Sequence, residues 1–376
     1  MTADLARQNF TLSLIIPCYN EERTIAACLE KTCSVAQGQN FALELIVVDD
    51  ASTDNSLREL AKVAQKYPRI RVLKHPVNRG KGAALRTGLV QAVGDFVGIQ
   101  DADDEYNPRE YLTLLQPLLN NQADVVFGSR YLCQDSRYVL YFWHTWMNKF
   151  LTWVSNMFTN LDLTDMETCY KLFRRAVIQK IAPQLKEERF GFEPEITARV
   201  AQLGCRVYEC AISYNPRSYE EGKKINWRDG IRALYCILHY SAHTAPLPMQ
   251  IILYFFIGGV SLFVNVFCFY LLGRFAWPLP HAIAGSFAAS ALANYLLCIH
   301  ILFQHKARWN TLGEIVVYIL AVAVMGVIDY GITGGLLALL WSPLRSKFWA
   351  AAVGFVGNFV LRRWVIFPEK KRPILV

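Results

Sequence analysis

Two aspartates separated by a single residue, Asp101 and Asp103, are the side chains of this sequence that are best placed for chemistry. They follow 96–99, a short apolar run that is typical of a buried strand. Two carboxylates at this spacing can share one hard cation, with Glu105 as a third oxygen ligand. Such a cation would neutralise a departing diphosphate. The alternative is an ordinary turn with solvated acids, but the position directly after a strand favours the metal site.

Polar residues also follow two earlier apolar runs. The run 12–16 leads into Pro17-Cys-Tyr-Asn-Glu21, and the run 43–48 leads into Asp49-Asp50. Open α/β sheets bind their ligands beyond the carboxyl ends of the strands. Three strand ends that each carry polar groups therefore predict one binding site along one edge of a sheet.

The remaining pattern predicts an α/β, Rossmann-like fold with a doubly wound sheet, because helical spacing alternates with the strands. The expected helices are 21–35, 52–67 and 82–92, and a further strand is expected at 71–73. Asn78-Arg-Gly-Lys-Gly82 precedes the third helix and is neither a P-loop nor a G-x-G-x-x-G motif. It is either a tight turn with a helix cap or a place where Arg79 or Lys81 approaches a phosphate.

Charge is distributed unevenly along the 376 residues. Residues 251–376 hold 10 of the 39 Lys and Arg residues and 3 of the 31 Asp and Glu residues, whereas charges nearly balance over 1–250. Four stretches of the second part are apolar enough to cross a bilayer. The expected spans are about 251–272, 280–303, 314–340 and 348–367. The net charge of +8 therefore reflects the flanks of membrane spans and does not indicate nucleic-acid binding.

These features predict two domains and an orientation. We expect a soluble domain over 1–243 and an all-α transmembrane domain over 244–376. The N-terminus lacks the basic region and apolar run of a signal peptide, so the first domain should stay in the cytoplasm. Lys and Arg are more frequent in the flanks on the same side as this domain, which the positive-inside rule also places in the cytoplasm. The sequence predicts an integral membrane protein, of the plasma membrane in a prokaryote.

The transmembrane part contains an internal repeat with an offset of 64 residues. Asn294-Tyr-Leu-Leu matches Asn358-Phe-Val-Leu, and Asn265 matches Asp329. The repeat predicts two helical hairpins of like orientation. An aspartate is costly in a bilayer, so Asp329 should face the interior of the bundle. There it would either form a hydrogen bond that packs two helices together, or take part in binding a lipid headgroup or in conduction.

Two stretches of the first domain are suited to a membrane surface. Residues 138–158 are rich in Trp, Tyr and Phe, with a His and a Lys among them, and residues 227–240 combine aromatic side chains with Arg228 and Arg232. Such amphipathic stretches predict interfacial helices that contact membrane lipids. The alternative is a pair of helices packed on the sheet.

Taken in order, the motifs resemble those of family 2 glycosyltransferases. The residues that carry the resemblance are Pro17-Cys-Tyr-Asn-Glu21, Asp49-Asp50, Asn78-x-Gly-x-Gly82, Asp101-Ala-Asp103, Gly128-Ser-Arg130-Tyr131 and Gly191-Phe-x-x-Glu195. The stretch 12–235 looks like the branch of dolichol-phosphate mannose synthases and polyprenyl-phosphate glycosyltransferases. The transmembrane part is similar to the GtrA-like four-helix domain that accompanies such enzymes.

The resemblance implies a GT-A fold and inverting transfer of a hexose from a UDP- or GDP-sugar to a polyprenyl or dolichyl phosphate. For the sugar donor, the resemblance implies two sets of residues. The nucleotide would be bound by Pro17, Tyr19, Glu21, Asp49 or Asp50, and Asp101. Mg²⁺ or Mn²⁺ would be bound by Asp101, Asp103 and Glu105. Asp103 would be a catalytic residue. Mannose synthases usually have Gln where Glu105 stands, so the identity of the donor stays open.

On the acceptor side, the resemblance implies that Arg130 and Arg217 are catalytic and face the acceptor phosphate, with Lys223 or Lys224 nearby. A phosphate monoester is largely ionised near pH 7, because its second pKa is about 6. It is already a nucleophile, so the site needs no general base. It needs cations that position two phosphorylated partners, and Arg suits phosphate through its bidentate geometry. Ordinary ion pairs are the alternative for these side chains.

The segment 164–171 (Thr-Asp-Met-Glu-Thr-Cys-Tyr-Lys) stands where mannose synthases usually read Asp-Pro-x-Ser-Gly-Phe-Arg. We expect Asp165 or Glu167 to touch the sugar, and the alternative is a loop braced by a pair between Asp165 and Lys171. A helix should begin near Gly191, where Glu193 or Glu195 favours the helix dipole whatever its further role.

Two other functions share parts of this pattern. Processive polysaccharide synthases have the same fold and carry Q-x-x-R-W beside the acceptor site, whereas the segment 304–309 (Gln-His-Lys-Ala-Arg-Trp) has one residue too many and lies between spans. A non-enzymatic flippase of lipid-linked sugars would not need Asp101, Asp103 and Arg130. Whether the membrane domain flips the product or only anchors the enzyme stays open, and so does the formation of a homo-oligomer.

Overall fold

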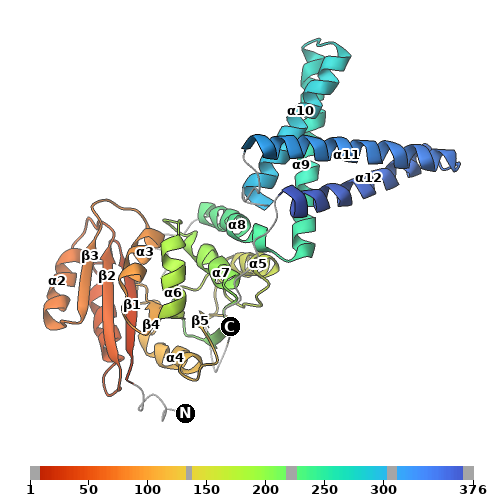
Figure 1. Cartoon of the computed structure of the whole chain (residues 1–376). Helices are drawn as coiled ribbons and strands as arrows, with labels where there is room; N and C mark the ends of the chain where they lie inside the picture. The colour runs from red at the N-terminus through yellow and green to blue at the C-terminus, as the bar shows by residue number, and fades with distance from the viewer. Residues whose placement is uncertain (1–8, 133–137, 217–226, 303–310, 367–376) are drawn as a thin grey trace. The chain divides into compact units, whose positions relative to one another are not determined.

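The computed structural model describes residues 9–132, 138–216, 227–302 and 311–366. The chain divides into two compact units, with the boundary between Thr244 and Ala245 (Figure 1). We call them the N-terminal unit and the C-terminal unit. Arg217, Lys223 and Lys224, which the sequence places at the acceptor phosphate, lie outside the described residues.

The N-terminal unit is built on a seven-stranded sheet with the order β3-β2-β1-β4-β6-β5-β7. The strands are β1 (Thr11–Cys18), β2 (Ala42–Asp49), β3 (Ile70–Lys74), β4 (Phe96–Ile99), β5 (Val125–Ser129), β6 (Lys171–Arg174) and β7 (Val207–Ala211). The four apolar runs expected to be strands are confirmed as β1 to β4. The first four strands are mutually parallel, as in the expected α/β sheet, whereas β6 runs antiparallel to both β4 and β5. The sheet is therefore mixed.

Helices cover the sheet and connect its strands. They are α1 (Ile25–Ser34), α2 (Ser56–Lys66), α3 (Lys81–Gln91), α4 (Tyr111–Leu119), α5 (Phe142–Thr159), α6 (Arg175–Ile181), α7 (Phe192–Gln202) and α8 (Trp227–Ser241). Short 3₁₀ turns occur at Pro108–Glu110, Ala182–Gln184 and Ala242–Thr244. The three helices expected in the first half of this unit correspond to α1, α2 and α3.

The centre of the sheet is buried on both faces. Every residue from Leu12 to Ile16 is inaccessible to solvent, although the side chains alternate between the faces. A continuous apolar strand is typical of a parallel strand with helices above and below it. Full burial of one such side chain stabilises the fold by about 1.5–3 kcal/mol. This rigid centre fixes the position of the loops that follow its strands.

Six strands end at the same edge of the sheet. β1 is parallel to β2 and β4, β2 is parallel to β3, and β5 is parallel to β7. Because β6 is antiparallel to β4 and to β5, those two strands point the same way. The segments after these six strands therefore lie along one rim, and they include nearly all the residues that the sequence predicts for the site.

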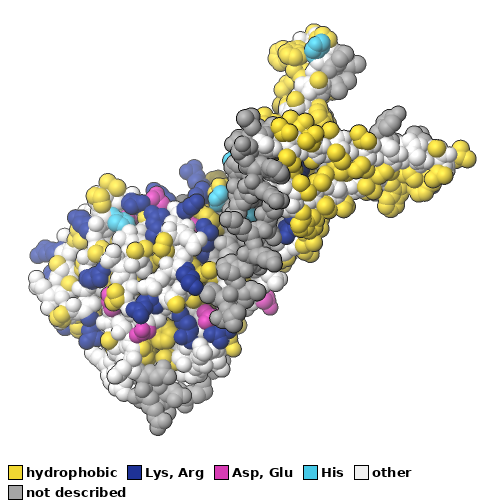
Figure 2. All heavy atoms as spheres, in the orientation of Figure 1, with side chains coloured by type: hydrophobic (Ala, Val, Ile, Leu, Met, Phe, Trp, Pro, Cys, Tyr) yellow, Lys and Arg dark blue, Asp and Glu magenta, His cyan; other side chains and the backbone are white. Residues whose placement is uncertain are grey.

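The C-terminal unit consists of helices. They are α9 (Leu247–Arg274), α10 (Leu279–Leu297), α11 (Thr311–Ala338) and α12 (Pro343–Val360), with π-helical segments at Cys298–Leu302 and Leu361–Ile366. α9 packs along α10 and α11 packs along α12, as expected for two hairpins. Figure 2 shows hydrophobic side chains over much of the visible face of this unit, whereas charged side chains are spread over the N-terminal unit.

Two helical segments among the described residues are long and apolar enough to cross a membrane, namely Leu247–Arg274 and Ala284–Leu302. Val316–Ile328 is a shorter apolar stretch. The expected count of four spans is therefore not confirmed, although four long helices are present. The third helix carries several glycines and an aspartate, which lower its hydropathy beyond that stretch.

Candidate active site

The first aspartate of the Asp-x-Asp motif forms an ion pair with a lysine. Lys81 is the first residue of α3, and its Nζ lies 2.9 Å from Oδ1 of Asp101 and 3.6 Å from Oε1 of Glu193. Burial opposes the charge of Lys81, but the surrounding anions, Asp101 first, hold its pKa well above the ordinary value. Of the two cations that could approach a phosphate, Lys81 thus lies at the motif. Arg79 instead pairs with Glu188 at 2.9 Å.

The other two predicted metal ligands turn toward different partners. Oδ1 of Asp103 accepts a hydrogen bond from the backbone N–H of Glu105 at 3.3 Å. Oε2 of Glu105 accepts one from the hydroxyl of Tyr214 at 3.0 Å. Among the described residues, no group of three or more His, Cys, Asp or Glu side chains is arranged to hold a metal ion. A ready three-ligand site is therefore not formed, although hard carboxylate oxygens are the donors that Mg²⁺ and Mn²⁺ prefer.

Asp50 and Asp49 have different surroundings at the end of β2. The carboxylate of Asp50 accepts the backbone N–H groups of Arg79 and Gly80, at 3.0 Å and 2.6 Å, and lies 2.7 Å from Nδ1 of His75. It therefore holds the loop that precedes α3. Oδ1 of Asp49 is buried and accepts no hydrogen bond from the part of the chain that the structure describes. Of the two, Asp49 thus has the acceptor that a ligand could satisfy.

The loop after β1 is tied to the loop after β2. The backbone N–H of Asn20 donates to Oγ of Ser52 at 3.0 Å, and the backbone N–H of Glu21 donates to Oγ of Ser56 at 2.8 Å. Oε2 of Glu21 also accepts from the hydroxyl of Thr24 at 2.9 Å. These bonds place 17–21, with Pro17 and Tyr19, beside Asp49 on the rim. The predicted nucleotide residues are thus brought together.

Arg130 directly follows β5 and forms a buried, two-pronged pair with Asp165. Nε of Arg130 lies 2.7 Å from Oδ2 of Asp165, and Nη2 lies 2.8 Å from Oδ1. Asp165 is fully buried, and the Arg130 side chain is 7% exposed. The Tyr214 ring lies 5.2 Å from the guanidinium. Tyr214 therefore contacts both Arg130 and, through its hydroxyl, Glu105.

The structure changes the prediction for the segment around Asp165. The expected brace between Asp165 and Lys171 is not present, because Nζ of Lys171 donates to the backbone carbonyls of Met166, at 3.0 Å, and Thr168. Asp165 lies behind Arg130 with both oxygens engaged, which leaves Glu167 as the acid with a free oxygen. Its Oε1 is buried and accepts no hydrogen bond within the described residues.

Glu167 lies close to a second buried acid. Burial first, and then the charge of Glu193, raises the pKa of Glu167 from its ordinary value of 4.5 to about 8. These surroundings therefore favour the protonated carboxyl group, which can donate a hydrogen bond. Oε2 of Glu193 is likewise buried without a partner among the described side chains. Glu195, in contrast, accepts hydrogen bonds from the backbone N–H groups of Lys186 and Glu187 and so stabilises that loop.

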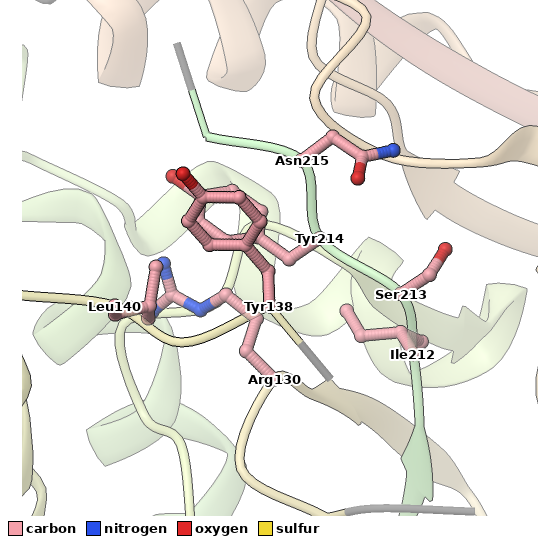
Figure 3. Close-up of a pocket in the computed structure, with 7 residues that line it drawn as sticks. All are labelled: Arg130, Tyr138, Leu140, Ile212, Ser213, Tyr214 and Asn215. Atoms are coloured by element: carbon pink, nitrogen blue, oxygen red, sulfur yellow. The ribbon is translucent and has the colours of Figure 1, made fainter. Parts of the chain in front are cut away.

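A cavity of about 150 Å³ opens beside Arg130 (Figure 3). Its lining comes from three segments of the chain, as Figure 3 shows: Arg130, then Tyr138 and Leu140, then Ile212, Ser213, Tyr214 and Asn215. The lining thus combines a cation, polar side chains and apolar side chains. The sequence did not single out Tyr214, because an aromatic residue after a strand forms no motif.

The chain matches two protein families. Residues 13–182 match the family described as Glycosyl transferase family 2, and residues 253–367 match the family described as GtrA/DPMS, transmembrane domain. The second match and the two long apolar helices indicate a membrane protein. The first match covers every predicted site residue that the structure describes, from Pro17 to Glu167.

Two named enzymes are relatives of this chain. A dolichyl-phosphate beta-glucosyltransferase of Trichomonas vaginalis is 29% identical over 220 residues, which cover 54% of this chain and 65% of that protein. A dodecaprenyl-phosphate galacturonate synthase of Rhizobium johnstonii is 26% identical over 221 residues, covering 57% and 62%. The chain thus spans somewhat less than two thirds of the length of these relatives.

The structure also matches in part a solved structure of glucosyl-3-phosphoglycerate synthase of Mycobacterium tuberculosis in complex with Mn²⁺, UDP and glucosyl-3-phosphoglycerate. It has a TM-score of 0.49 and 19% sequence identity, and the match covers 65% of this chain and 83% of that one. The two family matches correspond to the two compact units of the structure. The chain therefore carries a glycosyl transferase family 2 domain in its N-terminal unit and a GtrA/DPMS transmembrane domain in its C-terminal unit.

Proposed function

We propose that this protein transfers a hexose from a nucleotide-diphosphate sugar to a polyprenyl or dolichyl phosphate at the cytoplasmic face of a membrane, with inversion. One observation carries the proposal. Tyr214 contacts Glu105 through its hydroxyl and Arg130 through its ring, so the acidic and the cationic halves of the rim adjoin. A donor diphosphate with its cation and an acceptor phosphate need this arrangement of opposite charges. The names of the relatives agree with the reaction.

The donor would lie across the ends of β1, β2 and β4. The loop 17–21 and the free oxygen of Asp49 suit the nucleoside, since Asp49 has a buried acceptor to satisfy. Asp101 and Asp103 would hold Mg²⁺ or Mn²⁺ with the diphosphate as further ligand, and this cation would neutralise the leaving group. Lys81 fixes the orientation of Asp101 and adds a second positive charge beside the diphosphate.

The acceptor phosphate would lie in the cavity beside Arg130. Asp165 engages Nε and Nη2 of Arg130, and within the described chain Nη1 has no hydrogen-bond partner. The pair therefore orients Nη1 for a phosphate oxygen. The ionised phosphate attacks the anomeric carbon directly, so that the residues of the chain bind and orient and no side chain has to accept a proton.

The sugar would contact Glu167. Burial and the charge of Glu193 raise its pKa and favour the protonated form, which can donate a hydrogen bond, and Glu193 beside it can accept one. A polar pair of this kind distinguishes sugars by their hydroxyl groups, because a buried polar group left unpaired is costly. The choice between a UDP- and a GDP-sugar, and the sugar itself, are what the experiment below determines.

The lipid would reach the site along α5 and α8. These two helices lie side by side, and α5 exposes Trp143 (75%), Trp146 (49%) and Trp153 (58%). Trp227 at the start of α8 is 72% exposed. Aromatic side chains of this kind favour the interface between headgroups and acyl chains. We propose that α5 and α8 lie at the membrane surface, and that α9 to α12 make four spans.

The experiment is a transfer assay with the purified full-length protein. Labelled UDP- and GDP-sugars would be offered one at a time with Mn²⁺ or Mg²⁺ and a polyprenyl phosphate, and the organic-extractable product counted. We expect one donor to give a lipid product that mild acid cleaves, and Asp103→Ala to abolish it. Polymer in place of a lipid product would identify a polysaccharide synthase. The absence of product with every donor would contradict the proposed reaction.

A further inference from the structure

A buried glutamate joins α8 to the loop that precedes α7. Glu187 is 6% exposed and lies between the 3₁₀ turn Ala182–Gln184 and α7. Nη2 of Arg232 lies 2.9 Å from each of its carboxylate oxygens, and the hydroxyl of Tyr240 donates to Oε1 at 2.9 Å. Arg232 and Tyr240 both belong to α8. Charge-assisted hydrogen bonds of this kind are strong, so α8 holds the loop in one orientation.

The same loop packs against the first turns of α3. The backbone N–H of Ala83 donates to the carbonyl oxygen of Glu188 at 3.1 Å. Nη1 of Arg86 donates to the carbonyl oxygen of Leu185 at 2.9 Å. The loop that carries Glu187 is therefore held by α8 on one side and holds α3 on the other.

Lys81, which lies at the Asp-x-Asp motif, is the first residue of α3. Its Nζ also lies 3.6 Å from Oε1 of Glu193 in the first turn of α7. The elements around it are in close contact. A Cβ added to Gly191 would lie 2.5 Å from Oε2 of Glu187 and 2.6 Å from Sγ of Cys236 in α8. A displacement of α8 would therefore be passed on to the surroundings of Lys81.

The outward face of α8 is apolar. Trp227, Ile231 and Tyr235 are all exposed, and their spacing of four residues places them on one face of the helix. We call these three residues the apolar stripe. The guanidinium carbon of Arg232 lies 5.0 Å from the ring of Tyr235. Arg232 therefore contacts the apolar stripe and, through its N–H groups, Glu187.

We propose that Arg232 and Glu187 are positioning residues, which transmit contact between the apolar stripe and a lipid surface to Lys81. The inference rests on the proposed function, in which α8 lies at the membrane. The side chain of Arg232 is 53% exposed, so water weakens its attraction to Glu187. A lipid surface that covered the apolar stripe would hold α8 in place and shield this pair from water. The start of α3 would then keep Lys81 beside the diphosphate of the donor.

The experiment measures nucleotide binding in a bilayer. The full-length protein in phosphatidylcholine nanodiscs would be titrated with UDP or GDP and Mn²⁺ in a calorimeter. Hydrogen exchange of the peptide 79–86 would be followed by mass spectrometry, because the amide of Ala83 reports whether the loop holds α3. Neither measurement requires sugar transfer, and the exchange requires no ligand. A failure of the inference is therefore distinguishable from a failure of the proposed reaction.

We expect Arg232→Gln to weaken nucleotide binding about fivefold, less than the roughly tenfold effect of losing a charge-assisted hydrogen bond to the ligand itself. The amide of Ala83 should exchange faster in this variant. Arg232→Lys keeps the charge and should restore part of the affinity. Replacing Trp227 and Ile231 by Ser should weaken binding in the same direction, because α8 would lose its contact with the lipid.

A second arginine pair provides the matched control. Arg206 is 50% exposed and binds both carboxylate oxygens of Asp124, through Nη2 at 2.9 Å and Nε at 3.0 Å. It directly precedes β7 and so lies at the edge of the sheet opposite the candidate site. Arg206→Gln should leave both nucleotide binding and the exchange of Ala83 unchanged.

Three results would overturn the proposal. If Arg232→Gln bound nucleotide and exchanged at Ala83 like the wild-type protein, Arg232 would only stabilise α8, even if the melting temperature fell. Equal losses in Arg206→Gln would indicate a general effect of stability. Unchanged binding after replacement of Trp227 and Ile231 would show that contact with the lipid is not transmitted.

Discussion

At the residue scale, the buried pair of Arg130 and Asp165 determines how the predicted acceptor residue is held. Asp165→Asn would leave the guanidinium of Arg130 buried without its counter-charge. Removing one partner of a buried pair costs about 3–5 kcal/mol. We therefore expect a clear fall in the unfolding temperature of the N-terminal unit, together with loss of transfer. Circular dichroism melting of the purified protein measures the first effect.

A surface pair provides the control for this change. Lys66 and Glu30 lie 2.8 Å apart, but both side chains are at least half exposed. Glu30→Gln should leave the unfolding temperature nearly unchanged, because exposed pairs contribute little. If Asp165→Asn melted like the wild-type protein and lost only activity, Asp165 would touch substrate and would not position Arg130.

Glu167 should make stability depend on pH. Its pKa is 4.5 in the unfolded chain and about 8 in the folded one, so the folded state holds a proton that the unfolded state has lost between these values. The contribution of Glu167 to stability therefore decreases as the pH rises from about 4.5 to about 8. Lys171, Arg130, Asp165 and Glu193 all act on this carboxyl group.

Glu167→Gln mimics the protonated acid and tests this sign. The variant should melt close to the wild-type temperature at pH 4, where the acid is protonated in both states, and above it at pH 9, where the wild type buries a charge. Thermal melts at the two pH values measure the difference. A variant that lost stability equally at both values would show that Glu167 is ionised throughout.

The sequence predicted which residues lie on the rim better than it predicted their partners. Arg130 and the Asp101 segment directly follow strands, and the end of a strand can be predicted from the local sequence pattern. The contact between Arg130 and Asp165 joins positions 35 residues apart, and the contact between Glu105 and Tyr214 joins positions 109 apart. Such contacts depend on tertiary packing, which no local pattern contains.

At the element scale, the start of α3 depends on two close approaches. A Cβ added to Gly82 would lie 2.4 Å from the backbone oxygen of Glu187, and one added to Gly80 would meet that of Glu188. The helix can begin here only because glycine leaves room for the 187–189 segment. Lys81 stands between these two glycines, so the same approach positions its side chain at Asp101.

We therefore expect Gly82→Ala to destabilise the N-terminal unit by about 1–3 kcal/mol, the cost of overpacking. It should also reduce transfer, because Lys81 would shift with the helix. Gly230→Ala in α8 is the control. Nothing lies within 4 Å of the added Cβ there, and an alanine inside a helix should stabilise by about 0.5–1 kcal/mol. Chemical denaturation of both variants compares them, and equal stability would contradict the close approach.

Elements with a strong apolar pattern were predictable. β1 and β2 are continuous apolar runs, because both of their faces are buried. The reversed direction of β6 was not predictable, since a four-residue strand has the same local pattern in either direction. The interfacial helices expected near 138–158 and 227–240 are present as α5 and α8. Their membrane contact stays a prediction.

The aromatic face of α5 yields a kinetic prediction. Replacing Trp143 and Trp146 by Ser should raise the KM for a long-chain polyprenyl phosphate several-fold, because those rings would no longer anchor the site at the lipid interface. The KM for the nucleotide sugar should stay unchanged. A water-soluble short-chain acceptor is the control and should show little effect. A uniform loss for all substrates would instead indicate helices packed for stability.

At the scale of the whole molecule, the number of spans sets which loops face outward. Four spans place both 275–278 and 340–342 on the side opposite the N-terminal unit, whereas two spans place only the first loop there. Trp277→Cys and Ser342→Cys, both at exposed positions, can be labelled in intact cells with a membrane-impermeant maleimide. We expect both to react above the background of the unchanged chain. Labelling of Trp277→Cys alone would establish two spans.

The contact of Tyr214 with both halves of the rim has a consequence for additivity. Its hydroxyl donates to Glu105, and its ring lies beside the guanidinium of Arg130. Substitutions at residues that share a partner do not add in their effects on free energy. Changes at Glu105 and at Arg130 should therefore be coupled through Tyr214, although the two residues would bind opposite charges.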